Sequence, residues 1–165
     1  MQAACGRQFG MENGMLIDVI IPTYKPDEKL INLIRMLAVQ TVKINKIIIM
    51  NTEETYMNSL FFQDLCKEET ENIEIHHITQ QEFDHGATRN AGAGYSKADI
   101  IVYMTQDAVP LNEHLIEKLT EPFCDRTVAV AYARQVPGED SLPAECFARS
   151  FNYPDRDEIK CEDDL

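Results

Sequence analysis

The sequence predicts an α/β fold with three layers, in which helices cover both faces of a mainly parallel central sheet. Two observations lead to this class. Five apolar runs of strand length alternate with segments that have the spacing of amphipathic helices. The chain has 165 residues, of which 44% are hydrophobic, and this is enough to form a core.

The first strand and helix are predicted within residues 16–38. Residues 16–21 are mostly apolar, as expected for a strand buried on both faces, and Pro22 is expected to end it. Pro26 with Asp27 and Glu28 favours a helix start, because proline fits the first turn and acids suit the helix dipole there. Apolar residues then follow the i, i+3, i+4, i+7, i+8 pattern of a packed helix, at Leu30, Leu33, Ile34, Leu37 and Ala38.

The remaining elements continue the alternation. Further strands are predicted at residues 46–50, 72–78, 99–104 and 127–132, with 72–78 near the sheet edge. Helices are predicted at residues 60–66, 86–96 and 111–119. Gly92 and Gly94 inside a helix cost about 1 kcal/mol each relative to alanine, so close packing or ligand approach should compensate. Ala87, Ala91 and Gly94 with Tyr95 share the face that we predict packs on the sheet.

Charge and cysteine content exclude several classes of protein. The 28 acidic residues outnumber the 15 Lys and Arg, for a formal net charge of -13, which argues against nucleic-acid binding. An anionic ligand would need local help from backbone N–H groups, a few cations or a divalent metal. The five cysteines include no C-x-x-C pair, which favours a reducing, cytoplasmic setting. No apolar run approaches the roughly 20 residues that span a bilayer.

Three segments are predicted along the chain. Residues 1–14 have neither an apolar core nor a cleavage pattern and are expected to be a flexible extension. Residues 15–135 contain all the predicted strands. Residues 136–165 are interrupted by prolines and become acidic, which we interpret as the start of an incomplete further segment. The sequence does not indicate an oligomeric state.

Polar residues follow three of the predicted strands. The carboxyl ends of parallel strands meet at one edge of a sheet, so one crevice can use all three steps, and a lone carboxylate there is a candidate metal or phosphate ligand. Neither G-x-G-x-x-G nor G-x-x-x-x-G-K-[ST] occurs, which argues against a dinucleotide fold and a P-loop. The three steps are Pro22-Thr23-Tyr24, Asn51-Thr52-Glu53 and Thr105-Gln106-Asp107.

In combination, ordered motifs within residues 16–160 resemble the family 2 glycosyltransferases, in particular their bacterial rhamnosyltransferase branch. The motifs are residues 18–24 (DVIIPTY), 85–90 (HGATRN), 103–108 (YMTQDA), 133–135 (ARQ) and 147–154 (FARSFNYP). The resemblance implies a glycosyltransferase A-type (Rossmann-like) fold, a dTDP- or UDP-sugar donor, and Mg²⁺ or Mn²⁺.

The resemblance also implies roles for single residues in the donor site. The family's Asp-x-Asp motif appears here as Thr105-Gln106-Asp107, so only Asp107 carries the metal role, and Mg²⁺ commonly takes one or two protein carboxylates. Asn51 replaces the Asp that usually accepts from the base, and its amide can still accept and donate. The other matching donor-site positions are Pro22, Thr23, Tyr24, Gln106, and Arg89 with Asn90, whose guanidinium could reach the base or a phosphate.

By resemblance, the predicted reaction is transfer of a sugar, first of all rhamnose, to a cell-surface polysaccharide or lipid-linked acceptor. It would take place in the cytoplasm or peripherally at the inner face of the membrane. The family's catalytic base lies in the acceptor half, and the acids Glu139, Asp140 and Glu145 match no form of its motif. The base is therefore unassigned, and we expect the acceptor half to be missing.

Other interpretations stay open at this point. The chain could be a nucleotide-sugar-binding module without catalysis. A nucleotidyltransferase-like α/β enzyme is disfavoured, because no glycine-rich, lysine-containing loop follows the first strand. Asp107 could simply cap the helix predicted near residue 111. Arg89 could form a surface ion pair, and His76 and His77 could be half-exposed strand residues.

Overall fold

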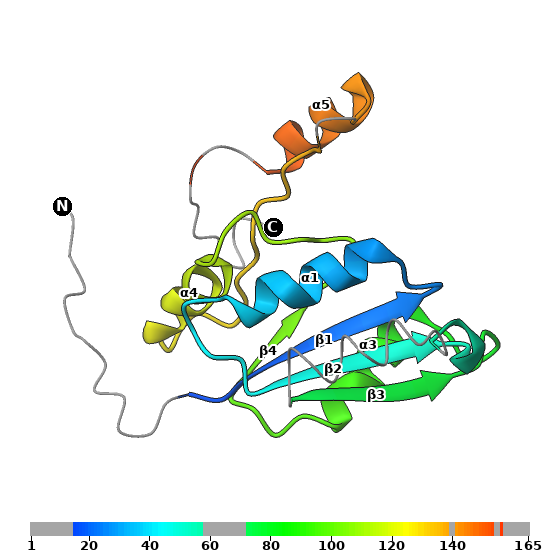
Figure 1. Ribbon diagram of the computed structural model, residues 1–165. Coiled ribbons are helices and arrows are strands. Elements are labelled where there is room, and N and C mark those ends of the chain that lie inside the picture. Colours follow the sequence, from blue (N-terminus) through cyan, green and yellow to red (C-terminus); the bar gives the residue numbers. More distant parts are fainter. Residues whose placement is uncertain (1–14, 58–71, 139–140, 154–155, 157–165) are drawn as a thin grey trace. The chain divides into compact units, whose positions relative to one another are not determined.

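The computed structural model describes residues 15–57, 72–138, 141–153 and 156 (Figure 1). Its strands form one parallel sheet in the order β3-β2-β1-β4. This confirms the predicted α/β class, and β3 lies at an edge as predicted for residues 72–78. The strands are β1 (Ile17–Tyr24), β2 (Lys46–Thr52), β3 (Ile73–Ile78) and β4 (Ile100–Tyr103).

The helices divide between two compact units, residues 1–120 and 121–165. The predicted helix at residues 60–66 and the extension at 1–14 lie outside the described residues. The predicted segment boundaries at 14/15 and 135/136 stay predictions. The first unit contains α1 (Glu28–Ala38), the short helix η1 (Glu54–Tyr56), α3 (His85–Gly94) and α4 (Leu115–Thr120), and the second contains η2 (Glu121–Cys124) and α5 (Pro143–Asn152).

The strand order reverses direction at β1. From β1 the chain moves outward to β2 and β3, and then returns to place β4 on the other side of β1. Because such crossovers are right-handed, α1 and α3 lie on opposite faces of the sheet, as Figure 1 shows. The gap between the carboxyl ends of β1 and β4 is therefore the topological switch point, where open α/β sheets bind ligands.

The predicted stripe of α1 forms part of the core. Leu30, Leu33, Ile34 and Leu37 are buried, together with Ile31, whereas Ala38 at the end of the helix is exposed. The helix starts later than predicted, at Glu28. Asp27 is its N-cap, and the Asp27 carboxylate accepts from the backbone N–H of Lys29 at 3.0 Å. Pro26 precedes the cap, so the prediction of proline in the first turn is wrong.

The prediction that Pro22 ends the first strand is also wrong, because β1 continues to Tyr24. The carbonyl of Ile20 accepts from the N–H of Met104, so Ile20 and every second residue after it face the β4 side. β4 itself ends at Tyr103, which is opposite Ile20. The missing N–H of Pro22 therefore costs no ladder hydrogen bond, and the proline is tolerated.

Two predictions fail after β4. Residues 127–132 form no strand, and Val130 and Tyr132 are 78% and 66% exposed. A strand needs a neighbour for its backbone groups, and none of the described strands pairs with this apolar run. The helix predicted from residue 111 begins only at Leu115, and Leu111 is exposed.

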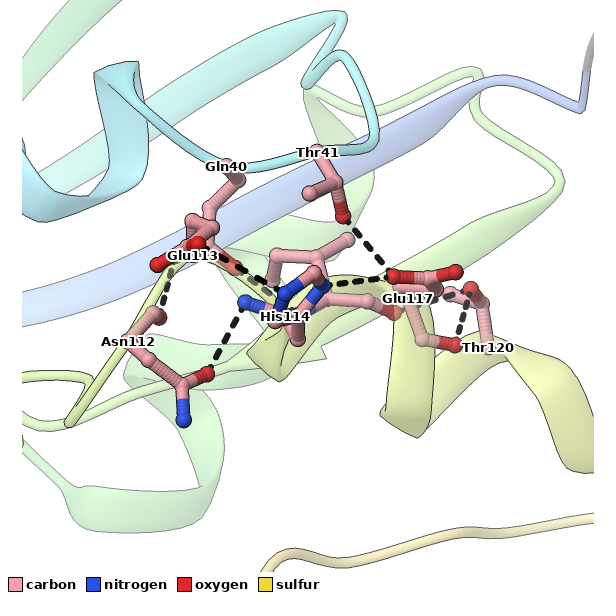
Figure 2. A network of polar contacts seen from close by, with 8 residues as sticks. Gln40, Thr41, Asn112, Glu113, His114, Glu117 and Thr120 are labelled. Carbon is pink, nitrogen blue, oxygen red and sulfur yellow. Dashed lines mark hydrogen bonds and ion pairs between the residues drawn. The ribbon is translucent and has the colours of Figure 1, made fainter.

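A polar network fixes the start of α4 against the end of α1 (Figure 2). The side-chain carbonyl oxygen of Gln40 accepts from the N–H of Ile116 at 3.0 Å, which supplies a partner for a donor in the first turn of α4. The Thr41 hydroxyl and the His114 ring donate to the Glu117 carboxylate at 3.0 and 2.9 Å. The ring of His114 and the hydroxyl of Thr41 hold the pKa of the Glu117 carboxyl below its usual range.

The face of α3 that packs on the sheet differs from the predicted one. Ala87, Ala91 and Gly94 are exposed, and the buried positions are Thr88 and Gly92. A Cβ on Gly92 would lie 2.7 Å from Cγ2 of Ile20 and 3.2 Å from Cγ of Met50. Glycine therefore lets the helix backbone approach the sheet closely, and this packing offsets its cost in a helix.

Replacement of Gly92 tests this close approach. We expect Gly92→Ala to lower the free energy of unfolding by about 1–3 kcal/mol through overpacking against Ile20. Gly94→Ala is the matched control, since apart from its chain neighbours and the backbone of its own helix no atom lies within 4 Å of a Cβ there, and it should stabilise by about 0.5–1 kcal/mol. Urea denaturation of both variants measures the difference, and equal stability of the two would contradict the packing described.

Candidate functional site

The predicted polar steps meet at the carboxyl edge of the sheet. In the ladder between β1 and β2, Thr23 lies opposite Asn51, and Tyr24 lies opposite Thr52. The chain leaves β4 through Met104, whose N–H donates to the carbonyl of Ile20 at 3.0 Å. The prediction that these three strand ends meet at one edge of the sheet is therefore confirmed.

Asn51 joins three neighbouring strand ends and is 0% exposed. Its carbonyl accepts from the hydroxyl of Thr23 at 3.1 Å. Its amide nitrogen donates to the backbone carbonyl of Glu53 and to Nδ1 of His77, both at 3.0 Å. The amide is thus engaged beneath the edge, and its predicted direct contact with a base stays a prediction. The bonds to Thr23 and His77 could not be read from the sequence, because they depend on strand register.

Gln106 spans the switch point between β4 and β1. Its side-chain carbonyl accepts from the N–H of Tyr24 at 2.9 Å, and its amide nitrogen donates to the carbonyl of Tyr24 at 3.1 Å. Both ends of the amide therefore hold the backbone at the end of β1. In this conformation Gln106 orients a predicted donor-site residue, and its own contact with a donor stays a prediction.

Asp107 lies on the surface beside this clamp. It follows Gln106 in a turn in which the N–H of Ala108 donates to the carbonyl of Thr105 at 3.1 Å. α4 begins at Leu115, so Asp107 does not cap that helix. Within the described part of the chain, its carboxylate has no hydrogen bond or ion pair, and no group of three or more His, Cys, Asp or Glu could hold a metal alone. A cation at Asp107 would need further ligands from the donor phosphates and water.

Backbone strain gathers at the same edge. Lys25 and Glu53 have φ values of 48° and 66°, and across the described residues no other non-glycine has positive φ. Each is the first residue after a strand end, β1 for Lys25 and β2 for Glu53. The Glu53 carboxylate accepts from the N–H of Gln80 at 2.6 Å, which holds this conformation. Such strain persists only where surrounding contacts impose it, and it is common at ligand sites.

The edge also carries an aromatic pair that the sequence did not single out. The rings of Tyr24 and Tyr56 meet edge to face with centroids 5.5 Å apart. Nζ of Lys25 lies 5.2 Å from the centroid of the first ring and 5.4 Å from that of the second. Nearby, Thr52 holds the single buried side-chain oxygen that lacks a hydrogen-bond partner among the described residues. The edge thus presents exposed rings and a cation, and an unsatisfied hydroxyl lies buried nearby.

The start of α3 carries the predicted Arg89 and Asn90. Asp84 caps the helix and accepts from the N–H groups of Ala87 and Gly86 at 2.7 and 2.9 Å, which hold the pKa of its carboxyl below the usual range. Arg89 donates from Nη1 to the carbonyl of His85 at 2.8 Å, and Asn90 is exposed. α3 contacts β1 and β2. The contacts of Arg89 and Asn90 with a donor stay predictions.

Comparison with known proteins decides the family. The model of "Glycosyl transferase family 2" matches residues 18–156. The chain belongs to glycosyl transferase family 2. This confirms the predicted family and favours a glycosyltransferase over a nucleotidyltransferase.

Two curated members of the family are rhamnosyltransferases. The chain is 33% identical over 152 residues to the O-antigen chain rhamnosyltransferase RfbN of Salmonella typhimurium, covering 92% of this chain and 47% of that protein. It is 32% identical over 149 residues to the O-antigen chain rhamnosyltransferase WbaN of Salmonella anatum, covering 89% and 45%. The chain therefore spans about half the length of these relatives.

Solved structures support the fold. TarS 1-349 of S. aureus matches with a TM-score of 0.56 at 16% identity, covering 76% of this chain and 40% of that chain. The same protein in complex with UDP-GlcNAc matches with a TM-score of 0.53 and also at 16% identity. At this identity the likeness concerns the fold alone, and it confirms the predicted glycosyltransferase A-type architecture.

The buried amide of Asn51 provides a stability test of the site's support. Asn51→Leu leaves the Thr23 hydroxyl and the Glu53 carbonyl without their partner, so we expect a loss of about 2–3 kcal/mol in the free energy of unfolding. Thr23→Val removes only one of these bonds and should cost about 1 kcal/mol. Urea denaturation gives both values, and a smaller loss for Asn51→Leu than for Thr23→Val would show that Asn51 is not the shared partner.

Proposed function

We propose that this family 2 chain binds a nucleotide diphosphate sugar, a dTDP- or UDP-sugar, at the carboxyl edge of its sheet. One observation carries the proposal: Gln106 clamps Tyr24 at the switch point and thereby sets the exposed Asp107 beside a strand end that carries an aromatic ring. This is where an open α/β sheet offers a crevice to a ligand. Tyr24 supplies a surface for a base, and Asp107 supplies an oxygen for a metal.

The base and ribose are assigned to the end of β1. Pro22, Thr23 and Tyr24 form the strand end, and Tyr24 is 40% exposed, so its ring is available to stack on a base. Asn51 supports this strand end from beneath through Thr23. Arg89 and Asn90 are proposed as further donor contacts, with the guanidinium suited to a phosphate.

Asp107 is the proposed ligand of Mg²⁺ or Mn²⁺. The residue fits the role, because its carboxylate is a hard oxygen donor, it is exposed, and no other described side chain engages it. When bound, such a cation stabilises the charge that develops on a departing nucleotide diphosphate. The acidic protein otherwise offers few positive charges for this purpose, since its formal net charge is -13.

The proposed reaction is transfer of rhamnose to a growing cell-surface polysaccharide or a lipid-linked acceptor. It is supported by the relatives RfbN and WbaN, which are O-antigen chain rhamnosyltransferases. The proposed setting is the cytoplasm or the inner face of the membrane. Within the described residues no helix is long and apolar enough to cross a bilayer.

A second candidate is a nucleotide-sugar-binding module without transfer activity. It is favoured by the incomplete acidic motif, in which Thr105 stands where the family's first Asp is expected. The catalytic base stays unassigned, because Glu145 pairs with Arg149 at 2.8 Å in α5, and Glu139 and Asp140 lie outside the described residues. Transfer of labelled rhamnose from dTDP-rhamnose to an oligosaccharide acceptor separates the enzyme from the module.

A thermal-shift panel of UDP, dTDP and their sugars, with and without Mg²⁺ or Mn²⁺, tests donor binding. A ligand at about 100 times its Kd should stabilise the fold by about 2.7 kcal/mol. We expect Asp107→Asn to remove the metal-dependent part of this shift and to leave a weaker, metal-independent part.

The matched control is Glu28→Gln, which removes the same charge from an exposed residue at the start of α1. It should keep the full metal-dependent shift. The proposal is wrong if no nucleotide diphosphate shifts the melting temperature. It also fails at Asp107 if Asp107→Asn keeps the same metal-dependent shift as the wild type.

A further inference from the structure

Lys25 occupies an unusual position at the end of β1. Its φ of 48° lies in the left-handed region, which residues other than glycine rarely adopt. The residue before it, Tyr24, is clamped through both its N–H and its carbonyl by Gln106. The backbone therefore holds Lys25 in a conformation that projects its side chain from a fixed point of the edge.

The ammonium of Lys25 lies against aromatic rings in a chain rich in carboxylates. Nζ is 5.2 Å from the ring centroid of Tyr24 and 5.4 Å from that of Tyr56. Among the described residues no carboxylate forms an ion pair with it, although Glu53 and Glu54 lie just after β2 at the same edge. The carboxylate of Glu53 is instead engaged by the N–H of Gln80.

The two rings are open to solvent apart from this cation. Tyr24 is 40% exposed and Tyr56 is 39% exposed. A cation within about 6 Å of a ring centroid is held by the electrons of the ring face. The two rings are nearly perpendicular, so a flat base that stacks on one of them meets the other at its edge and competes with the ammonium for the same surface.

We propose that Lys25 and Tyr56 complete the donor site, and that Lys25 moves on binding from the two tyrosine rings to the donor diphosphate. This inference rests on the proposed function and adds two residues to it. The rings of Tyr24 and Tyr56 bind the nucleobase, and the displaced ammonium of Lys25 binds the phosphates on the side of Asp107.

Physical considerations favour the exchange. Stacking of a base on an aromatic side chain is stronger than an exposed contact between a lysine and a ring, so the base displaces the ammonium. The flexible four-carbon stem of lysine lets the ammonium turn while its Cα stays fixed. A diphosphate then offers a charge-assisted hydrogen bond, which is stronger than the contact that was lost. Because Tyr24 is clamped to Gln106, which precedes Asp107, Lys25 remains at the edge where the metal is proposed.

The exchange predicts opposite effects on a nucleoside and on its diphosphate. NMR chemical-shift titration of Lys25→Met with uridine and UDP, and with thymidine and dTDP, measures them at a fixed Mg²⁺ concentration. The variant should bind the nucleoside about 2- to 5-fold more tightly, since the ring faces are free of the cation. It should bind the diphosphate about 10-fold more weakly, because one charge-assisted hydrogen bond is lost.

Three further variants control this result. Lys43→Met removes the same charge from an exposed residue in the loop before β2, at the amino-terminal end of that strand. It should change neither affinity. Lys25→Arg should keep diphosphate binding within about 3-fold, since a guanidinium also binds phosphate. Tyr56→Leu should weaken the nucleoside and the diphosphate by the same factor, about 5-fold or more. Thermal unfolding without ligand shows that each variant is folded.

Two outcomes overturn the inference and are distinguishable. If the wild type binds UDP or dTDP but Lys25→Met weakens the nucleoside and the diphosphate equally, or weakens neither, then Lys25 does not exchange between rings and phosphates. The proposed donor site stands in that case. If the wild type binds none of the four compounds, the proposed function itself fails and this inference fails with it.

Discussion

The structure depends on a fully buried amide at the point where a parallel sheet presents its carboxyl edge. Asn51 accepts from Thr23 and donates to Glu53 and His77, so the ends of β1, β2 and β3 are held in one register. A buried polar group is costly unless each of its donors and acceptors is paired. Because the carbonyl and both N–H groups of the Asn51 amide are paired in this arrangement, the amide stabilises this geometry of the edge. The strained backbone of Glu53 is supported by the same contacts.

The second clamp, Gln106, extends this order across the switch point. The ladder between β4 and β1 ends at Tyr103, and the N–H of Met104 adds one more bond to Ile20, so Gln106 holds the part of β1 beyond this ladder. The clamp holds the backbone of Tyr24 and thereby the residues next to its two members, Lys25 after Tyr24 and Asp107 after Gln106. The residues that bear charge and aromatic surface are exposed, whereas those that position them are buried or bonded to backbone. This division suits a site that binds a flexible anionic ligand on a rigid support.

The sequence predicted the parallel sheet, the edge position of β3 and the convergence of the strand ends. These features follow from the apolar runs and from the order of strands and helices, and they do not depend on which residues pair across the sheet. It misplaced features that depend on contacts between distant segments. Pro22 was expected to end β1, although the early end of β4 leaves its missing N–H harmless. Residues 127–132 have the pattern of a strand, but none of the described strands pairs with them. At the site, the positions of Asn51 and Gln106 were found, but their partners were not, since a side chain's partner depends on strand register and loop conformation. The positive φ of Lys25 and its contact with Tyr56 cannot be recognised from the amino-acid sequence around Lys25.

A nucleotide diphosphate and its metal are proposed to bind at this carboxyl edge. Paramagnetic broadening of backbone amide NMR signals by substoichiometric Mn²⁺ in the presence of UDP tests this binding. We expect broadening centred on Lys25 and on Gln106 to Ala108, with little effect on Thr41 or Glu117 in the network of Figure 2. Broadening centred instead on the acidic residues Glu113 and Glu117, or spread evenly over the acidic surface, would contradict the claim.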